Sequence, residues 1–232
     1  YDYQCDPHIP LMVGVVIANA PPQPLTYVPD SAFEAYLEAN GMGNGIPNDS
    51  NVLTANINTV TYLDVSYEFI SDLTGIEDFT ALIYLDCDLN QLTTLDVSQN
   101  TALTNLFCND NQLTSLDVSQ NTALTWLSCY TNQLTSLDVS GATALTSLDC
   151  ENNQLTTLDV SQNTALTVLS CGSNQLTTLD VSQNTALTRL YCEDNNLTTL
   201  DVSNNTALTW LYCYTNQLTT LDVSQNTALT TL

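Results

Sequence analysis

The chain has 232 residues, and its 44% content of apolar residues is enough to build a substantial core, which argues against disorder. Its 25 acidic residues face a single Lys or Arg, so the formal net charge is -24. A surface this acidic repels phosphate backbones and anionic headgroups, which excludes nucleic-acid binding and binding to an anionic membrane surface.

Residues 1–24 form an apolar segment that is interrupted by prolines. The run 9–20 has the length of a signal-peptide apolar region, but acidic residues precede it and Pro21 follows it, so we interpret it as a β-strand. It is too short to cross a bilayer, and we expect no membrane insertion. The first residue is Tyr1 rather than Met, which is typical of a processed product or a fragment.

Residues 25–59 are predicted to form an N-terminal cap that contains a helix at about 31–40. Ser31 and Glu34 have the spacing of a capping box, in which Ser31 begins the helix. Gly41 supplies the signal that ends it.

Residues 60–232 are a repeat array with one unit of 22 residues, seven units of 21 and a partial last unit. The unit that starts at Leu103 reads LTNLFCNDNQLTSLDVSQNTA, and in it Leu106 and Cys108 alternate with polar or variable neighbours, as in a short strand with one buried face. One such coil is too thin to bury its apolar face alone, so neighbouring coils must stack. The array therefore predicts a solenoid with a parallel β-sheet on one face and short irregular return segments, preceded by the small helical cap.

The motifs L-x-x-L-x-C-x-x-N-x-L and L-T-x-L-D-V-S-x-N-T-A-L resemble those of bacterial leucine-rich repeat proteins. The second motif is similar to that of secreted repeat proteins of the Bacteroidetes kind, with internalins as more distant relatives. The match covers about three quarters of the chain. This resemblance implies a leucine-rich repeat solenoid and a secreted or cell-surface location.

Two residue types recur at buried positions of the repeat. An Asn closes each strand, where its amide is expected to satisfy backbone groups of the turn, and Glu68 replaces it in the first unit, which should therefore be built differently. Seven cysteines recur every 21 residues on the inward side of the strand. We expect buried free thiols; disulfide pairing is an alternative, and a metal column is disfavoured because no His accompanies the thiols. The Asn positions are Asn90, Asn111, Asn132, Asn153, Asn174, Asn195 and Asn216, and the Cys positions are Cys87, Cys108, Cys129, Cys150, Cys171, Cys192 and Cys213.

A column of aspartates occupies the L-D-V-S segment on the return side. It consists of Asp96, Asp117, Asp138, Asp159, Asp180, Asp201 and Asp222. Like charges about 5 Å apart repel each other by very roughly 0.8 kcal/mol per pair in a water-like dielectric, so something must offset the repulsion. Hydrogen bonds from backbone N–H groups or from the neighbouring Ser and Thr are one explanation, and calcium bound between coils is the other. No other cofactor is expected.

Variation between the units is concentrated on the outward strand positions, where we place the candidate ligand-binding site. Exposed aromatic side chains beside carboxylates suit sugar stacking or a protein hot spot, whereas packing of aromatics across coils is the alternative explanation. Two aromatic clusters are expected, one at Phe107, Trp126 and Tyr130 and the other at Tyr191, Trp210, Tyr212 and Tyr214. The candidate site consists of Phe107, Trp126, Tyr130, Asp149, Glu151, Arg189, Tyr191, Trp210, Tyr212 and Tyr214.

The sequence offers no catalytic residues, so we expect no enzyme. The single His, His8, lies in the N-terminal segment, and Asp149 and Glu151 are expected on an open surface where nothing raises a pKa. We expect a non-catalytic binding or adhesion module whose partner is a protein or glycan at a cell surface. The alternative is a subunit of an extracellular filament, in which segment 9–20 of one copy covers the open last repeat of the next.

Overall fold

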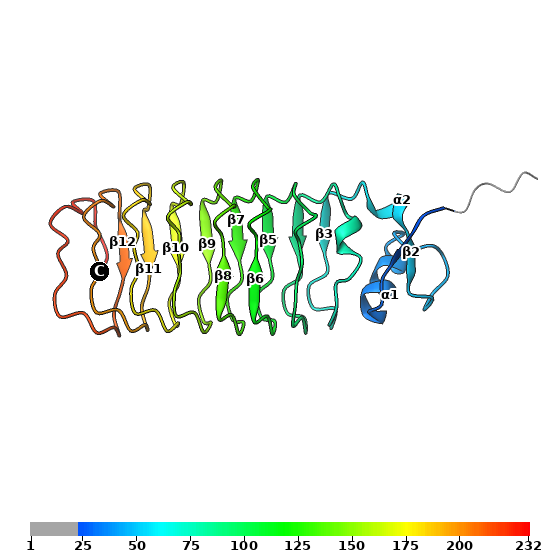
Figure 1. Cartoon of the computed structure of the whole chain (residues 1–232), viewed down its shortest axis with the longest axis horizontal. Coiled ribbons are helices and arrows are strands. Elements are labelled where there is room, and N and C mark those ends of the chain that lie inside the picture. Colours follow the sequence, from blue (N-terminus) through cyan, green and yellow to red (C-terminus); the bar gives the residue numbers. More distant parts are fainter. Residues whose placement is uncertain (1–22) are drawn as a thin grey trace, which may run out of the picture.

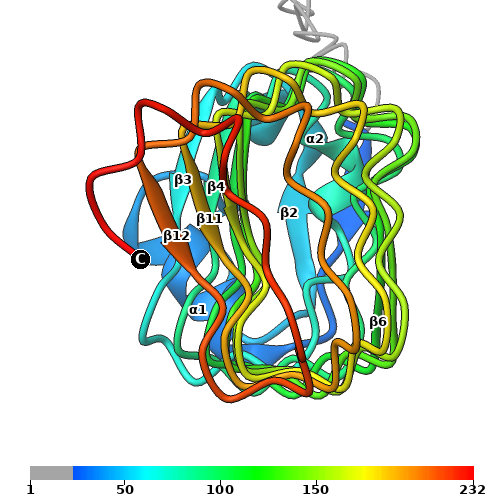
Figure 2. The same ribbon diagram turned by 90° about the vertical axis from the view of Figure 1, so that its left-hand side faces the viewer.

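The computed structural model describes residues 23–232; the predicted strand at 9–20 lies outside the described residues. The described chain is an elongated stack of coils with a small helical region at one end (Figure 1). Viewed along the stack, successive coils superpose and enclose a common interior (Figure 2). Within this part of the chain, no helix combines the length and apolar character that crossing a bilayer requires.

The helical region packs against the first coils. Strands β1 and β2 pair antiparallel beside two helices, and Phe33 of the longer helix stacks on Phe79 of the first coil with ring centroids 6.3 Å apart. Both side chains are fully buried, so this helix extends the apolar interior of the solenoid. The elements are β1 (Leu25–Tyr27), α1 (Ser31–Ala39), β2 (Asn51–Leu53) and α2 (Thr54–Ile57).

The predicted capping box is wrong. Asp30 is the N-cap of α1, and its Oδ1 accepts hydrogen bonds from the backbone N–H groups of Ala32 and Phe33. Glu34 turns away from the helix start, and its Oε1 accepts from the N–H groups of Asp49 and Ser50. Asp30 also accepts at Oδ2 from the first-coil loop at Ser71, so one carboxylate satisfies the helix start and ties the helix to the array.

The helix end is as predicted. Gly41 has a φ of 74°, a left-handed conformation that glycine adopts without a steric penalty. The N–H of Gly41 donates to the carbonyl of Glu38 at 3.2 Å, and that of Met42 donates to Leu37 at 2.8 Å. These two bonds form a Schellman motif, which satisfies carbonyls that the helix end leaves free.

The solenoid face carries one eight-stranded parallel sheet in the order β12-β11-β10-β9-β7-β5-β4-β3. Neighbouring strands pair with the leucines in register, as in Leu63 with Leu85 and Leu106 with Leu127, and these leucines are buried. The repeat length thus sets the register, because equivalent residues of successive coils become neighbours. The strands are β3 (Tyr62–Asp64), β4 (Tyr84–Asp86), β5 (Asn105–Phe107), β7 (Trp126–Ser128), β9 (Ser147–Asp149), β10 (Val168–Ser170), β11 (Arg189–Tyr191) and β12 (Trp210–Tyr212).

The return side is mostly irregular. It contains the short 3-10 helix η1 (Ile76–Asp78) and one parallel strand pair, β6 (Ser115–Asp117) with β8 (Ser136–Asp138). Just beyond this pair, a Cβ on Gly141 would stand 1.7 Å from the carbonyl oxygen of Ser119. Glycine therefore permits a close approach of these two coils, which explains why the return side pairs here.

The strand-closing Asn residues act as predicted. The side-chain amide of Asn90 donates to the carbonyls of Val65, Cys87 and Asp88, and its Oδ1 accepts from the N–H of Ile70. In the first coil, where Glu68 replaces the Asn, the residues on both sides of Glu68 have positive φ angles. The later coils have only one such residue at this turn, which confirms that the first coil is built differently.

A second Asn column, which we did not predict, lies in the S-x-N-T-A segment. Each of its amides donates to two carbonyls of the preceding coil, as Asn121 does to Val97 at 2.9 Å and Asn100 at 3.0 Å. Ala142 interrupts the column, and the Oδ1 atoms of the others are buried without a hydrogen-bond partner. The column consists of Asn100, Asn121, Asn163, Asn184, Asn205 and Asn226.

Candidate functional site

The outward side chains of the eight-stranded sheet and of the residues just after it form a surface that we call the variable strand face. It holds three rows, because equivalent positions pair in register from β3 to β12. The first row runs along Tyr62, Tyr84, Asn105, Trp126, Ser147, Val168, Arg189 and Trp210, and the second along Asp64, Asp86, Phe107, Ser128, Asp149, Ser170, Tyr191 and Tyr212. The third comprises Ser66, Asp88, Asn109, Tyr130, Glu151, Gly172, Glu193 and Tyr214.

One aromatic stack runs from the first coil into the middle of this face. Tyr62 lies on Tyr84 with centroids 4.5 Å apart, Tyr84 contacts Phe107 at 5.4 Å, and Phe107 meets Trp126 edge-on at 5.3 Å. The stack includes two tyrosines that the sequence analysis left out of the site, although their row positions beside Phe107 were the signal. Tyr130 borders the same hollow as Phe107 and Trp126, the other members of the predicted first cluster.

The second aromatic cluster is assembled as predicted. Tyr212 contacts Tyr191 at 5.3 Å, Trp210 at 6.3 Å and Tyr214 at 6.1 Å. The guanidinium carbon of Arg189 stands 5.8 Å from the centre of the Trp210 ring, within cation–π range. Trp210 keeps 39% of its surface exposed and Trp126 keeps 47%, so packing across coils leaves both indoles accessible.

A hollow of about 480 Å³ lies between the two clusters. Trp126 and Phe107 border one end and Tyr191 the other, while Asp149 and Glu151 contribute carboxylates. Tyr130, Asp149 and Glu151 also border an adjoining hollow of about 540 Å³. The structure therefore brings the carboxylates of the candidate site into the same hollow as its aromatic side chains.

The expectation that nothing raises a pKa on this face is wrong. Burial raises the pKa of Asp149, with the charge of Glu151 adding to it, and burial likewise raises the pKa of Glu193. Burial raises the pKa of Asp88 to about 6, although hydrogen bonds from the side chain and backbone of Asn109 oppose the shift. These carboxyl groups lie between side chains of neighbouring coils, which shield them from water in a way that a single repeat does not reveal.

The return-side aspartates are exposed and hydrogen-bonded locally. In each of the seven, Oδ1 accepts from the N–H of the Ser two residues later, at 2.8 to 2.9 Å. These bonds lower the pKa of most of the column, for example that of Asp159. Among the described residues no three His, Cys, Asp or Glu side chains are grouped as a metal site requires, and calcium binding remains an untested prediction.

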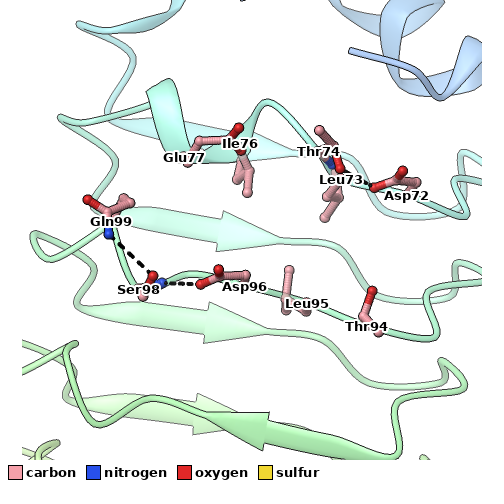
Figure 3. A pocket seen from close by; sticks show the side chains of 10 residues that line it. All are labelled: Asp72, Leu73, Thr74, Ile76, Glu77, Thr94, Leu95, Asp96, Ser98 and Gln99. Carbon is pink, nitrogen blue, oxygen red and sulfur yellow. Dashed lines mark hydrogen bonds between the residues drawn. The ribbon is translucent and has the colours of Figure 1, made fainter. Parts of the chain in front are cut away.

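A further hollow, of about 360 Å³, lies on the return side near the first coil (Figure 3). Asp72, Glu77 and Asp96 border it, and the dashed lines show that Asp72 and Asp96 accept hydrogen bonds from Thr74 and Ser98. These bonds are the same local turns as elsewhere in the column. Nothing in this hollow distinguishes it as a binding site.

The seven repeat cysteines carry free thiols that point into the core. Six are fully buried and Cys213 is partly exposed. Three of the thiols donate to a carbonyl of the next coil, as Cys87 does to Phe107 at 3.3 Å. Burial raises the pKa of these thiols, so they are poor nucleophiles and contribute to packing.

The stacked L-x-x-L-x-C coils, the Asn columns and the parallel sheet define a leucine-rich repeat solenoid of the internalin type. The comparisons agree, and the chain is an internalin-like leucine-rich repeat protein. A stretch of 43 residues, 18% of this chain and 5% of the relative, is 54% identical to Internalin J of Listeria monocytogenes. Residues 192–216 match the family model described as the LVIVD repeat.

Solved structures extend the likeness to most of the chain. The functional domain of InlJ from Listeria monocytogenes, described as including a cysteine ladder, is 41% identical with a TM-score of 0.67, covering 89% of this chain and 51% of that one. A leucine-rich repeat protein of Leptospira interrogans is 28% identical with a TM-score of 0.71, covering 77% and 49%. Internalin C2 of Listeria monocytogenes, at 21% identity, a TM-score of 0.68 and coverage of 91% and 100%, shares the fold. The chain thus spans about half the length of the first two structures.

Proposed function

We propose that this chain is a non-catalytic protein-binding module of a secreted or cell-surface protein, and that the variable strand face is its binding surface. The observation that carries this proposal is the pair of exposed indoles, Trp126 and Trp210, on the same face as an acid-lined hollow that Trp126 borders. Large, rigid aromatic side chains beside charged groups are the residues that dominate protein interfaces.

The distribution of sequence variation supports the same surface. The return side repeats nearly the same residues in the seven 21-residue units, whereas the three rows differ from coil to coil. Solenoids present extended surfaces of this type to their ligands. A partner that contacts the rows meets a combination of side chains that changes along the face, which selective recognition requires.

The acidic character of the face restricts the partner. Asp86, Asp88, Asp149, Glu151 and Glu193 all lie in the second and third rows, and Arg189 is the only cation of the whole chain. Complementary charge steers association and suppresses wrong partners. We therefore expect a partner with a basic surface, which favours a protein over a neutral glycan.

Capture with matched variants tests the proposal. The chain is immobilised and exposed to solubilised cell-surface proteins and, in parallel, to a glycan array. Trp126→Ala and Trp210→Ala should each weaken retention of a captured protein at least tenfold. Tyr27→Ala, which removes a more exposed aromatic side chain outside the variable strand face, should leave retention unchanged. Retention that survives both Trp substitutions, or that falls equally in the Tyr27 variant, would refute this surface.

The glycan and filament alternatives have different outcomes. If the chain binds glycans through Trp126 and Trp210 and captures no protein, the proposed partner is a sugar rather than a protein. Head-to-tail assembly relies on segment 9–20, which lies outside the described residues, so it remains an untested expectation.

A further inference from the structure

The third row contains a symmetric run of side chains over five successive coils. Its members are Tyr130, Glu151, Gly172, Glu193 and Tyr214. The row keeps its register beyond the strands, because the N–H groups of Asn152 and Ser173 donate to Gly172 and Glu193 in the next coils at 3.1 and 2.9 Å. Two carboxylates therefore flank a position without a side chain, and a tyrosine lies beyond each carboxylate.

Glu193 leans over the glycine. A Cβ on Gly172 would stand 3.1 Å from the carboxyl carbon of Glu193 and 3.3 Å from its Oε1. The carboxylate thus occupies space that any other residue at position 172 would fill. Because Glu151 precedes Gly172 in the row, this conformation directs the charge of Glu193 towards that of Glu151.

The Glu193 carboxylate lacks a donor for one of its oxygens. Glu193 is only 9% exposed, and its Oε2 is buried without a hydrogen-bond partner. Burial and the charge of Glu151 both raise the pKa of this carboxyl group. A buried acceptor without a donor is unfavourable, and a second carboxylate nearby makes it more so. A cationic donor placed between the two would relieve both effects.

Among residues 23–232, no side chain or backbone group donates to the Oε2 atom of Glu193. The single Lys or Arg of the chain is Arg189, whose guanidinium lies over Trp210. The contact of Glu151 is weak, since the Ser170 hydroxyl donates to its Oε2 at 3.4 Å. Arg189 is therefore not available to Glu151 and Glu193, and a cation of a partner would complement them.

A planar organic cation fits better than a metal ion. Among residues 23–232 no three carboxylate, thiol or imidazole groups converge as a metal site requires. A guanidinium has five donors in a rigid plane, which can bridge two carboxylates and stack on an aromatic ring. Tyr130 and Tyr214 offer such rings at either end of the run, and Tyr214 is well exposed.

We propose that Glu151 and Glu193, which flank Gly172 in the third row, bind an arginine side chain of the partner protein. This inference rests on the proposed function, since it assigns the chemistry of one contact on the variable strand face. It also accounts for the glycine, because a side chain at position 172 would displace the Glu193 carboxylate.

The test uses a probe that does not require the partner. The ¹⁵N-labelled chain is titrated with acetyl-Gly-Arg-Gly-amide, and backbone amide shifts are followed by NMR. Gly172 and Glu193 should show saturable shifts that the equivalent citrulline peptide, which lacks the charge, does not cause. A lysine peptide should bind at least threefold more weakly than the arginine peptide.

Three variants locate the contact. Glu193→Gln and Gly172→Ala should each weaken arginine-peptide binding at least fivefold, the second without changing any charge. Asp194→Asn is the matched control, since it removes a neighbouring charge at a left-handed position that Asn tolerates, and it should change binding less than twofold.

Equal weakening by Glu193→Gln and Asp194→Asn would mean that only bulk charge attracts the peptide, and it would overturn the inference. Equal shifts with the citrulline peptide, or equal affinity for the lysine peptide, would also overturn it. If the arginine peptide does not bind while Trp126→Ala still abolishes protein capture, the proposed function stands and the arginine contact does not.

Discussion

The Oδ1 atom of Asn153 accepts a hydrogen bond at 2.9 Å from the backbone N–H of Leu134, a residue of the preceding coil. The side-chain amide of Asn153 donates to three carbonyls, those of Cys129, Cys150 and Glu151. One buried side chain therefore bonds to four backbone groups across two coils, and only one of them, the Glu151 carbonyl, also accepts a backbone N–H, that of Thr131.

We predict that Asn153→Ala lowers the free energy of unfolding by about 2–4 kcal/mol, because it leaves buried backbone groups without partners. Urea denaturation followed by circular dichroism measures this. Gln154→Ala, an exposed neighbour, is the control and should change stability by less than about 0.5 kcal/mol. A loss for Asn153→Ala as small as that of the control would contradict the structural role of the Asn column.

Gly141→Ala should destabilise the chain by about 1–3 kcal/mol, because the new Cβ would stand 1.7 Å from a backbone carbonyl oxygen. Gly172→Ala should cost less than about 1 kcal/mol, because its nearest contact, at 3.1 Å, is the flexible end of the Glu193 side chain. Urea midpoints of the two variants compare them directly. Equal midpoints would show that the coils at Gly141 separate freely.

The cysteine column should react as buried free thiols. In the folded chain a thiol reagent should label Cys213 first among the seven repeat cysteines, because the other six are fully buried. Mass spectrometry after brief labelling identifies the modified residue. Under denaturing, non-reducing conditions all eight cysteines of the chain should react, whereas a count near two would indicate disulfides.

The stability of the chain should increase as the pH falls from 7 to 5. The pKa of Asp88 is about 6 in the folded chain, above its ordinary value of 3.8. Between these two pH values the folded state binds more protons than the unfolded state. The free energy of unfolding therefore decreases as the pH rises through this range. Asp88 alone should contribute roughly 1 kcal/mol between pH 5 and pH 7. Urea denaturation at each pH measures the trend, and Asp88→Asn should reduce it.

At lower pH the trend should reverse. The pKa values of return-side aspartates such as Asp159 and Asp180 lie below the ordinary value, so their contribution is lost as the pH falls through the folded pKa. For the range from pH 5 to pH 7, a free energy of unfolding that rises steadily would contradict the burial of Asp88 and of the other carboxylates on the variable strand face.

Calcium should not stabilise the chain more than magnesium does. The return-side aspartates are already hydrogen-bonded to serine N–H groups, so a divalent cation should act mainly by screening the net charge of -24. Melting curves in equal concentrations of the two chlorides test this. A melting temperature several degrees higher in calcium would instead establish a specific site in the column.

The stacking of the coils follows from the repeat period alone. A period of 21 residues places equivalent residues of successive coils side by side, so the sheet, the Cys column, the strand-closing Asn column and the three variable rows could all be predicted. The second aromatic cluster followed for the same reason, since Tyr191 and Tyr212 are one repeat apart. Periodicity specifies which residues are neighbours without any knowledge of side-chain conformations.

The burial and the direction of each side chain depend instead on how the coils pack in three dimensions. Asp30 rather than Ser31 caps the helix, because its Oδ1 accepts from Ala32 while its Oδ2 accepts from Ser71 of the first coil. Glu193 leans over Gly172 because two neighbouring coils leave that space, and Gly141 approaches Ser119 because it lacks a Cβ. Burial, hydrogen bonding and pKa depend on atoms contributed by several coils, and a pattern read within one repeat does not contain them.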